Sequence, residues 1–406
     1  MNFHTLLVSL IICLTLTSCH VGRFFVWNFA DTNDKKKFAS VDLKAPESTF
    51  YFKKVDEEQN PLKLPETLRV DGETFSFENG LDESKTVAFL VIRNDSLLYE
   101  NYLDDYTPQT IHTSFSVAKS FVSALVGIAI EEGHIKSVKE PISNYLTDLH
   151  PDINDTITIE DLLDMRSGIT FNEGYYNPFG HVAKFYYGTN LRKYITQLKS
   201  GGAPDQNFDY ISSNPQMLGS ILENATGKPL YEYMQEKIWT PLEMETDATW
   251  SIDSKKNKMV KAFCCLNATA RDFAKFGRLY LNKGNWNGKQ IVSEKWVTQS
   301  TTFDRVKNGF QYSYQWWHMP YYQAKTDTTK LPAMYDTGSY TTKDSTTNQK
   351  VEKTYLVSPT APFLAEGILG QFIYINPEKN LIIVRLGKKY GKTQWERNFR
   401  AIAKMN

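Results

Sequence analysis

The stretch FSVAKSFVSALVGIAIEE, residues 115–132, decides the fold, because apolar residues occupy nearly every side of the helix that it predicts. A helix of this kind is buried rather than lying on the surface, and Gly133 ends it. Ser116 and Lys119 stand in its first turn and share one face, because residues three apart on a helix are neighbours. We therefore expect the Ser116 hydroxyl and the Lys119 amine to meet at the start of a buried helix.

This pair can form a nucleophile. A serine hydroxyl attacks a carbonyl when a neighbouring base removes its proton, and a lysine is such a base only when its amine is neutral. At an ordinary pKa of about 10.4, roughly one lysine in a few thousand is neutral at pH 7, so burial must lower the pKa of Lys119. The alternative interpretation is a capping serine followed by a surface lysine, which is what most Ser-x-x-Lys matches are.

Two later segments add to this pair. Tyr210, in Phe208–Ser212, precedes a predicted helix and can shuttle a proton between Ser116 and a leaving group; the alternative is a tyrosine held in the core. Residues Gly367–Gln371 lead into a strand, and an edge strand beside the nucleophile can offer a backbone N–H that forms an oxyanion hole with the N–H of Ser116. The alternative is an ordinary glycine-flanked strand.

Strand patterns stand at both ends of the folded region. Residues 87–93 and 96–102 are apolar-rich runs joined by Asn94-Asp95, which predicts a tight hairpin. Residues 370–375 and 381–386 predict a second hairpin with a turn-rich connection. We expect one sheet completed by its two ends.

Helices fill the middle of the chain. Thr158 caps a predicted helix over Ile159–Arg166, Asn214 is expected to cap a helix that runs to about residue 224, and a further helix follows Thr269 and reaches Asn282.

The domain organisation follows from these elements. We expect a signal peptide over residues 1–19, an N-terminal extension over 20–80, and one enzyme domain over 81–406 with a helical subdomain at about 135–270. The polar stretch 326–348 is interpreted as an exposed insertion or loop.

Composition excludes several function classes. With 46 basic and 46 acidic residues there is no global field to attract nucleic acid. Metal-ligand spacings such as HExxH or paired CxxC do not occur, so we predict no metal and no cofactor. Cys264 and Cys265 are adjacent and are expected to be buried free thiols rather than a strained vicinal bridge.

The N-terminus predicts export. Residues 6–16 are almost wholly apolar but too short to span a bilayer, and Leu-Thr-Ser followed by Cys19 resembles the bacterial lipobox, in which the cysteine is acylated after cleavage. The alternative is an ordinary signal peptide. An acylated Cys19 would hold the protein on a membrane, facing the periplasm or the exterior.

The order Ser-x-x-Lys, tyrosine, glycine-rich strand resembles the serine β-lactamase and penicillin-binding-protein superfamily. The resemblance is closest to its class C-like branch, which includes esterases, DD-peptidases and nylon-oligomer (6-aminohexanoate-dimer) hydrolases. It covers roughly residues 85–400. Supporting stretches are residues 162–168, 268–272 and 370–377.

The resemblance implies an α+β, β-lactamase/transpeptidase-like fold, an antiparallel sheet flanked by helices with an inserted helical subdomain. It makes Ser116 the nucleophile, with Lys119 and Tyr210 as the general acid/base pair. The N–H of Ile368 would join that of Ser116 in the oxyanion hole, and Tyr175 would contact the substrate.

Two departures from the lactamases of this branch affect the expected substrate. Ser212 stands where they have the Asn of Tyr-x-Asn, and Gly367-Ile368-Leu369 replaces their Lys-Thr-Gly, so the usual carboxylate-binding lysine is missing. Together with Gln371, Ser212 and Gly367 are candidate substrate-binding residues. We expect hydrolysis of a small or short peptide-like ester or amide; the alternatives are a cell-wall DD-peptidase, a weak β-lactamase, or a non-catalytic binding protein of the same fold.

Overall fold

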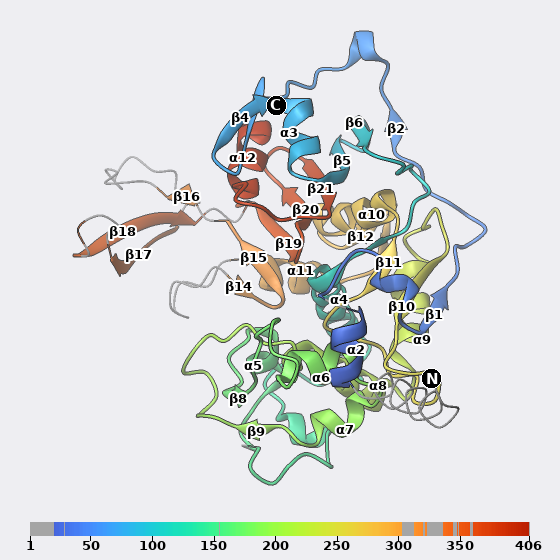
Figure 1. Ribbon diagram of the computed structural model, residues 1–406, viewed down its shortest axis with the longest axis vertical. Helices are drawn as coiled ribbons and strands as arrows, with labels where there is room; N and C mark the ends of the chain where they lie inside the picture. The colour runs from blue at the N-terminus through green and yellow to red at the C-terminus, as the bar shows by residue number, and fades with distance from the viewer. Residues whose placement is uncertain are drawn as a thin grey trace, which may run out of the picture. The chain divides into compact units, whose positions relative to one another are not determined.

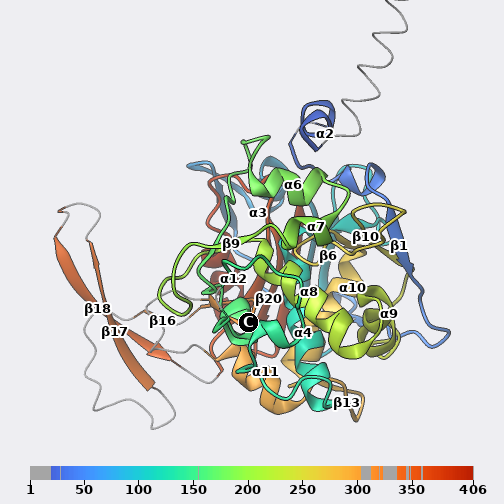
Figure 2. The same ribbon diagram turned by 90° about the horizontal axis from the view of Figure 1, so that it is seen from below.

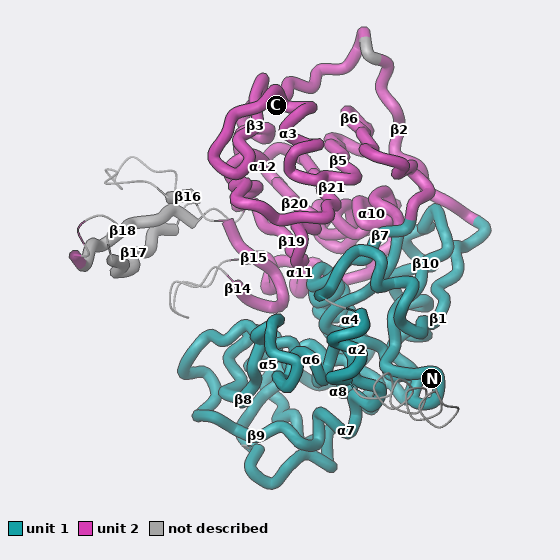
Figure 3. Tube along the Cα trace, in the orientation of Figure 1, with its two compact units in different colours: residues 1–47, 111–268 teal, residues 48–110, 269–406 magenta. Residues whose placement is uncertain are grey.

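The computed structural model describes residues 20–27, 29–153, 155–302, 312–319, 321–322, 336–343, 347, 349–357 and 360–405. The chain divides into two compact units, drawn in two colours in Figure 3. Unit 1 comprises residues 1–47 and 111–268, and unit 2 comprises residues 48–110 and 269–406. The chain thus passes from unit 1 into unit 2, returns, and ends in unit 2.

Unit 2 is built on an eight-stranded sheet in the order β14-β15-β19-β20-β21-β5-β6-β2 (Figure 1). Its pairs are antiparallel except for the two-residue β2, which runs parallel to β6. Strand β21 pairs with β5, so the predicted joining of the two ends in one sheet is confirmed. The strands are β2 (Lys53–Lys54), β5 (Thr86–Arg93), β6 (Ser96–Tyr102), β14 (Tyr312–Ser313), β15 (Trp316–His318), β19 (Phe363–Gly367), β20 (Gln371–Asn376) and β21 (Leu381–Gly387).

Both faces of this sheet are covered by helices. Helix α10 (Ala270–Leu281) packs on β20 and β21, where Gly277 lies so close that a Cβ would be 3.0 Å from Ile373 and Ile382. On the opposite face the Phe399 ring of α12 (Trp395–Met405) packs against Phe372 at a centroid distance of 5.4 Å. Burial on both faces explains why β20 and β21 are apolar without alternation.

The predicted hairpins are both present. Asn94 and Asp95, between β5 and β6, have φ values of +50° and +59°, as a type I′ turn requires at its two central residues. Strands β20 and β21 form the second hairpin. Unit 2 is completed by η2 (Glu57–Gln59), β3 (Thr67–Val70), β4 (Glu73–Ser76), α3 (Phe77–Glu83), β12 (Asn285–Trp286), β13 (Lys289–Gln290) and α11 (Glu294–Thr301).

Unit 1 is mainly helical, with a four-stranded sheet in the order β1-β10-β11-β7 (Figures 1 and 3). At its centre the predicted buried helix is confirmed: one 3-10 turn, η3 (Phe115–Val117), leads into α4 (Ala118–Glu131), which packs on α8 (Ser213–Thr226). The other helical elements are α2 (His20–Trp27), η1 (Asp34–Lys36), η4 (Ile142–Asn144), α5 (Ile159–Leu163), α6 (His181–Tyr187), α7 (Leu191–Ile195), α9 (Leu230–Met234) and η5 (Gln235–Trp239). The strands are β1 (Ser40–Leu43), β7 (His112–Thr113), β8 (Ile169–Thr170), β9 (Lys199–Ser200), β10 (Ala248–Ser251) and β11 (Leu266–Ala268).

Two of the three predicted helix starts are confirmed. Thr158 and Asp161 form a reciprocal capping box at α5, and Thr269 accepts a hydrogen bond from the third residue of α10. Helix α5 ends earlier than expected, at Leu163, because Met165 adopts a left-handed φ of +58° that a helix cannot continue through.

The prediction that Asn214 caps α8 is wrong. The N-cap position is two residues earlier, at Ser212, and Asn214 lies inside the helix. Its side-chain carbonyl instead accepts a hydrogen bond from the Ser167 hydroxyl at 2.8 Å. Asn214 therefore joins α8 to the segment that follows α5.

The stretch 326–348 is expected to be an exposed insertion or loop, and the loop alternative is wrong where the structure describes it. Residues Asp336–Lys343 form β17, which pairs along its whole length with β18 (Lys350–Val357), and β16 (Tyr321–Tyr322) completes a three-stranded sheet. Residues 326–335 lie outside the described residues. Strand β17 is favoured by its Thr and Tyr residues, which are common in strands, although the surrounding sequence is polar.

Candidate active site

The candidate nucleophile stands at a strained start of α4. Phe115, the residue before Ser116, is fully buried and has a φ of +44°, a conformation that bulky residues rarely adopt. The Ser114 hydroxyl donates to the Phe115 carbonyl at 3.0 Å and helps to hold this turn. As a result the side chain of Ser116 is partly exposed while its neighbours on both sides are buried.

Ser116 and Lys119 meet as the sequence predicts. The Nζ atom of Lys119 lies 2.7 Å from the Oγ atom of Ser116. Lys119 is 1 % exposed, and its burial lowers the pKa of the amine to about 8, although the negative charge of Glu173 acts in the opposite direction. A neutral amine is thus accessible near physiological pH, within reach of the proton that it has to accept.

Tyr210 belongs to the same group. Its ring faces Lys119, with Nζ 4.9 Å from the ring centroid. The preceding residue, Asp209, donates its N–H to the carbonyl of Met165 at 2.8 Å, which fixes the segment before α8 against the residues that follow α5. Ser116 and the two residues predicted to handle its proton, Lys119 and Tyr210, therefore lie together in unit 1.

Glu173 is a member of the site that sequence reasoning missed. Ser212 donates its N–H to one carboxylate oxygen of Glu173 at 2.8 Å and its hydroxyl to the other at 2.6 Å. The Tyr175 hydroxyl also donates to Glu173, at 3.1 Å. The signal in the sequence was slight. Glu173 stands two residues before the candidate Tyr175, and the partner of Glu173, Ser212, lies 39 residues further along the chain.

Ser212 and Tyr175, both predicted to contact substrate, are thus joined through one carboxylate. Ser212 is buried, so its hydroxyl serves to hold Glu173. Tyr175 is 38 % exposed and keeps its hydroxyl on Glu173; burial of that hydroxyl, followed by the charges of Glu173 and Tyr210, raises the pKa of Tyr175. Tyr175 therefore presents a protonated phenol beside Tyr210.

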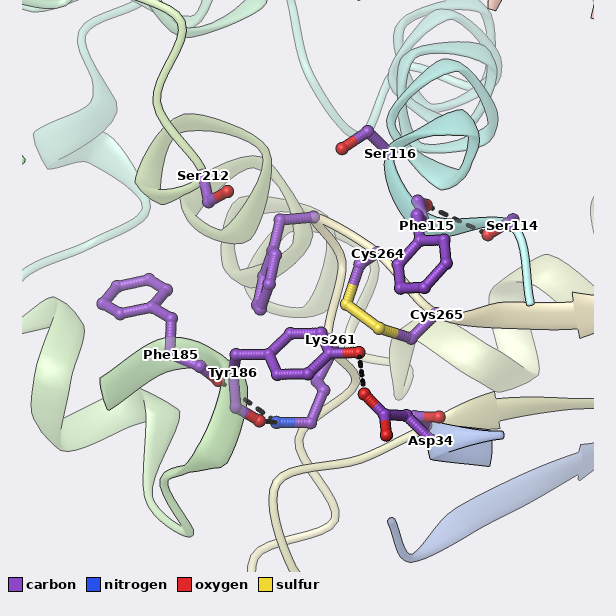
Figure 4. The surroundings of a disulfide bond; sticks show 12 residues. Asp34, Ser114, Phe115, Ser116, Phe185, Tyr186, Ser212, Lys261, Cys264 and Cys265 are labelled. Atoms are coloured by element: carbon purple, nitrogen blue, oxygen red, sulfur yellow. Dashed lines mark hydrogen bonds between the residues drawn. A yellow bond between two sulfur atoms is a disulfide. The ribbon is translucent and has the colours of Figure 1, made fainter. Parts of the chain in front are cut away.

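The expectation of free thiols at Cys264 and Cys265 is wrong, because the two form a disulfide. Cys265 has a φ of +70°, a turn that lets adjacent side chains approach each other. Phe115 and Ser116 are among the residues that surround the bond in Figure 4. The preceding residue, Phe263, accepts a hydrogen bond from Nζ of Lys119 through its carbonyl at 3.0 Å.

A second buried lysine, Lys261, fixes the segment that leads into Cys264. Lys261 is fully buried and donates to the carbonyls of Phe185 and Tyr186 in α6, at 3.1 and 2.8 Å (Figure 4). Burial lowers the pKa of Lys261 to about 7. Because its main chain runs directly into Phe263, this anchor also positions the carbonyl that holds Lys119.

The predicted oxyanion segment, Gly367–Gln371, lies in unit 2. It is the turn between β19 and β20 and not an edge strand, because β15 and β21 pair on the outer sides of this hairpin. The Gln371 side chain donates to the carbonyls of Ile368 and Gly387 at 3.1 and 2.7 Å, so it stabilises the turn itself. The pairing of the Ile368 N–H with that of Ser116 stays a prediction.

Cys19 lies outside the described residues. Among the residues that are described, no three His, Cys, Asp or Glu side chains converge as metal ligands would. Within the same residues, none of the helices combines the length and apolar character needed to cross a bilayer.

Comparison with known proteins gives the relationships of the chain. The sequence profile of the Beta-lactamase family matches residues 76–405. The 6-aminohexanoate-dimer hydrolase of Paenarthrobacter ureafaciens is 29 % identical over 262 residues, a match that spans 59 % of this chain and slightly less than two thirds, 66 %, of that enzyme.

Solved structures show the same fold. A candidate 6-aminohexanoate-dimer hydrolase from Bacillus anthracis superposes with a TM-score of 0.73 at 24 % identity, covering 95 % of this chain and 96 % of that one. A class C beta-lactamase solved with cefoxitin gives a TM-score of 0.56 at 14 % identity, covering 80 % and 95 %. The predicted α+β fold of the β-lactamase/transpeptidase type is confirmed.

Proposed function

Since the chain is a member of the beta-lactamase family of serine hydrolases, we propose that it cleaves an ester or amide through an acyl-enzyme on Ser116. The observation that carries this proposal is the 2.7 Å approach of a buried Lys119 amine to a partly exposed Ser116 hydroxyl. A surface lysine beside a capping serine, the other interpretation of this pattern, would be exposed and charged.

The proposed reaction has two steps. Oγ of Ser116 attacks the carbonyl carbon while its proton passes to the neutral Nζ of Lys119; the tetrahedral intermediate then collapses, and the leaving oxygen or nitrogen takes a proton by way of Tyr210. Water next attacks the acyl-enzyme, gives up a proton to the same pair, and releases the acid and free Ser116. Each step returns Lys119 to its starting state.

A linear substrate is favoured over a β-lactam. The lysine that binds the lactam carboxylate in related enzymes has no counterpart in Gly367-Ile368-Leu369, and the segment before α8 carries Ser212 bound to Glu173. The relative from Paenarthrobacter ureafaciens is named for a linear amide dimer. We therefore propose a short linear ester or amide as the substrate, with peptidase or weak lactamase activity as the alternative.

A fluorophosphonate probe tests the proposal, because it labels only an activated serine. We expect labelling of the folded chain that Ser116→Ala abolishes and that the control Ser143→Ala, at another partly exposed serine, retains. Absence of labelling in folded protein would instead support a binding protein. Rates with a p-nitrophenyl ester, 6-aminohexanoate dimer and nitrocefin then rank the substrate classes, and fastest turnover of nitrocefin would contradict the preference for linear substrates.

We also propose that Cys19 is acylated and that the enzyme works at the outer side of a bacterial membrane. The Leu-Thr-Ser-Cys sequence after the apolar run supports this proposal. Labelled palmitate should be incorporated into the expressed chain and lost in Cys19→Ser; incorporation into both would place the modification elsewhere.

A further inference from the structure

Exposed apolar side chains of the described residues are concentrated in unit 1 at two short segments. Nine large hydrophobic residues are exposed, and three of them, Tyr51, Tyr390 and Met405, belong to unit 2. The other six lie in α2 with the residues just after it and in the loop between β8 and α6, and we call them the aromatic patch. They are Phe25, Val26, Phe29, Tyr175, Tyr176 and Phe179.

The two segments form one surface. The rings of Phe29 and Tyr176 are in edge contact at a centroid distance of 5.1 Å, although the residues are far apart in sequence. Beneath them Phe24 is buried, with centroid distances of 5.9 Å to Phe29 and 5.5 Å to Tyr187 of α6. Helix α2 packs on α6 in both ribbon views (Figures 1 and 2). The patch is therefore held in place on a folded base.

The two segments of the aromatic patch contain no acidic residue, since residues 20–29 and 174–180 have no Asp or Glu. The acids that flank these segments have partners: Asp31 is paired with Lys37 at 3.2 Å, and Glu173 is bound by Ser212. Arg23 stacks over the Trp27 ring at 5.3 Å and donates to the Tyr187 carbonyl. Exposed aromatic side chains with a tryptophan and a cation at their rim are typical of a protein face lying in the bilayer interface.

We propose that the aromatic patch docks on the surface of a lipid bilayer. The sequence before α2 supports this occupant, because the apolar run 6–16 ends three residues before Cys19, and Cys19 is directly followed by the first residue of α2. Consecutive Cα atoms are about 3.8 Å apart, so a bilayer holding Cys19 would lie against the first turn of α2. A tether alone would not require Tyr176 and Phe179 to be apolar and exposed, since they are more than 150 residues away in sequence.

Photocrosslinking on the full chain tests the proposal. p-Azidophenylalanine is placed at Phe179, 71 % exposed, and for control at Tyr51, 64 % exposed, and the chain is mixed with vesicles of phosphatidylcholine and phosphatidylglycerol carrying a clickable lipid. We expect at least fivefold more lipid adduct from position 179. Equal yields would show a tether without docking, and adducts to a second copy of the chain would show self-association; either result overturns the proposal.

A paired substitution gives a second measurement. Phe25→Ser with Phe179→Ser should at least halve the fraction of chain that floats with these vesicles, whereas Tyr51→Ser with Tyr390→Ser should not change it; equal flotation of the two pairs contradicts docking. Hydrolysis of a soluble p-nitrophenyl ester verifies that each variant is folded. Because that assay needs no membrane, failure of docking and failure of the proposed hydrolase activity are distinguishable.

Discussion

Nζ of Lys119 donates to the carbonyl of Phe263 at 3.0 Å, and Phe263 directly precedes the Cys264–Cys265 disulfide. The amine that is to deprotonate Ser116 is thus oriented by a segment whose two ends are fixed, by the disulfide on one side and by the Lys261 anchor on the other.

Removing the disulfide should therefore disturb catalysis. We expect Cys264→Ser with Cys265→Ser to lower kcat/KM for a p-nitrophenyl ester by roughly tenfold, because a small displacement of a positioned group is costly. The existence of the bond is checked first: alkylation of unfolded, unreduced protein should leave both cysteines unmodified. Alkylation of both, or an unchanged kcat/KM in the double variant, would contradict this role.

Activity should follow the deprotonation of Lys119. Because burial lowers the pKa of its amine to about 8 and the neutral form is the base, kcat/KM should rise with pH up to about 8 and level off above it. Lys119→Ala should lower kcat/KM by roughly 10²- to 10⁴-fold, while the exposed Lys136→Ala should not change it. Steady-state rates between pH 5 and 10 are the measurement. A profile that is flat across this range would show that Lys119 is not the titrating base.

Glu173 should shift that profile. Its negative charge raises the pKa of Lys119, so Glu173→Gln should move the acid limb of kcat/KM to lower pH while glutamine still accepts a hydrogen bond from Ser212. The control Asp152→Asn removes an exposed carboxylate of the same unit and should leave the limb in place. If the acid limb of the Glu173→Gln variant stays at the wild-type pH or moves to higher pH, then Glu173 does not raise the pKa of Lys119.

The β19–β20 turn offers a test of stability. Gly370 has a φ of +80°, and a Cβ there would lie 1.9 Å from Nη1 of the fully buried Arg385, whose guanidinium donates to the carbonyls of Leu369 and Gly370. Gly370→Ala should lower the free energy of unfolding by about 2–4 kcal/mol. Gly288→Ala, at φ +91° with no atom within 4 Å, should cost only about 1 kcal/mol. Equal losses of unfolding free energy in the two variants, measured by urea unfolding, would show that the Arg385 side chain moves aside at little cost.

Features set by neighbouring residues were predictable from the sequence. The turn at Asn94-Asp95 was one, because both residues tolerate a left-handed backbone. The contact of Ser116 with Lys119 was another, because helix periodicity alone places them together. The capping box of Thr158 followed from spacing in the same way.

Features set by tertiary contacts were not predictable. Asn214 and Ser212 are both good cap residues, and only the hydrogen bond from Ser167 to Asn214 decides between them. The bond between Cys264 and Cys265 is accompanied by a positive φ at Cys265, to which no residue pattern points. Glu173 became visible only when folding brought Ser212 to it.

Glu173 accepts three hydrogen bonds, two from Ser212 and one from Tyr175, and those from Ser212 limit how often the loop that carries Glu173 can open. Only the two bonds from Ser212 join the 171–180 loop to α8, because Tyr175 belongs to the loop itself. A hydrogen bond to a charged group contributes about 1.5–3 kcal/mol, so swinging the loop away from α8 would cost at least about 3 kcal/mol. At that cost the loop is closed in more than about 99 % of the molecules, because each 1.4 kcal/mol changes the ratio of closed to open molecules roughly tenfold. Because Glu173 belongs to this loop, its negative charge remains near Lys119 in nearly every molecule that meets substrate.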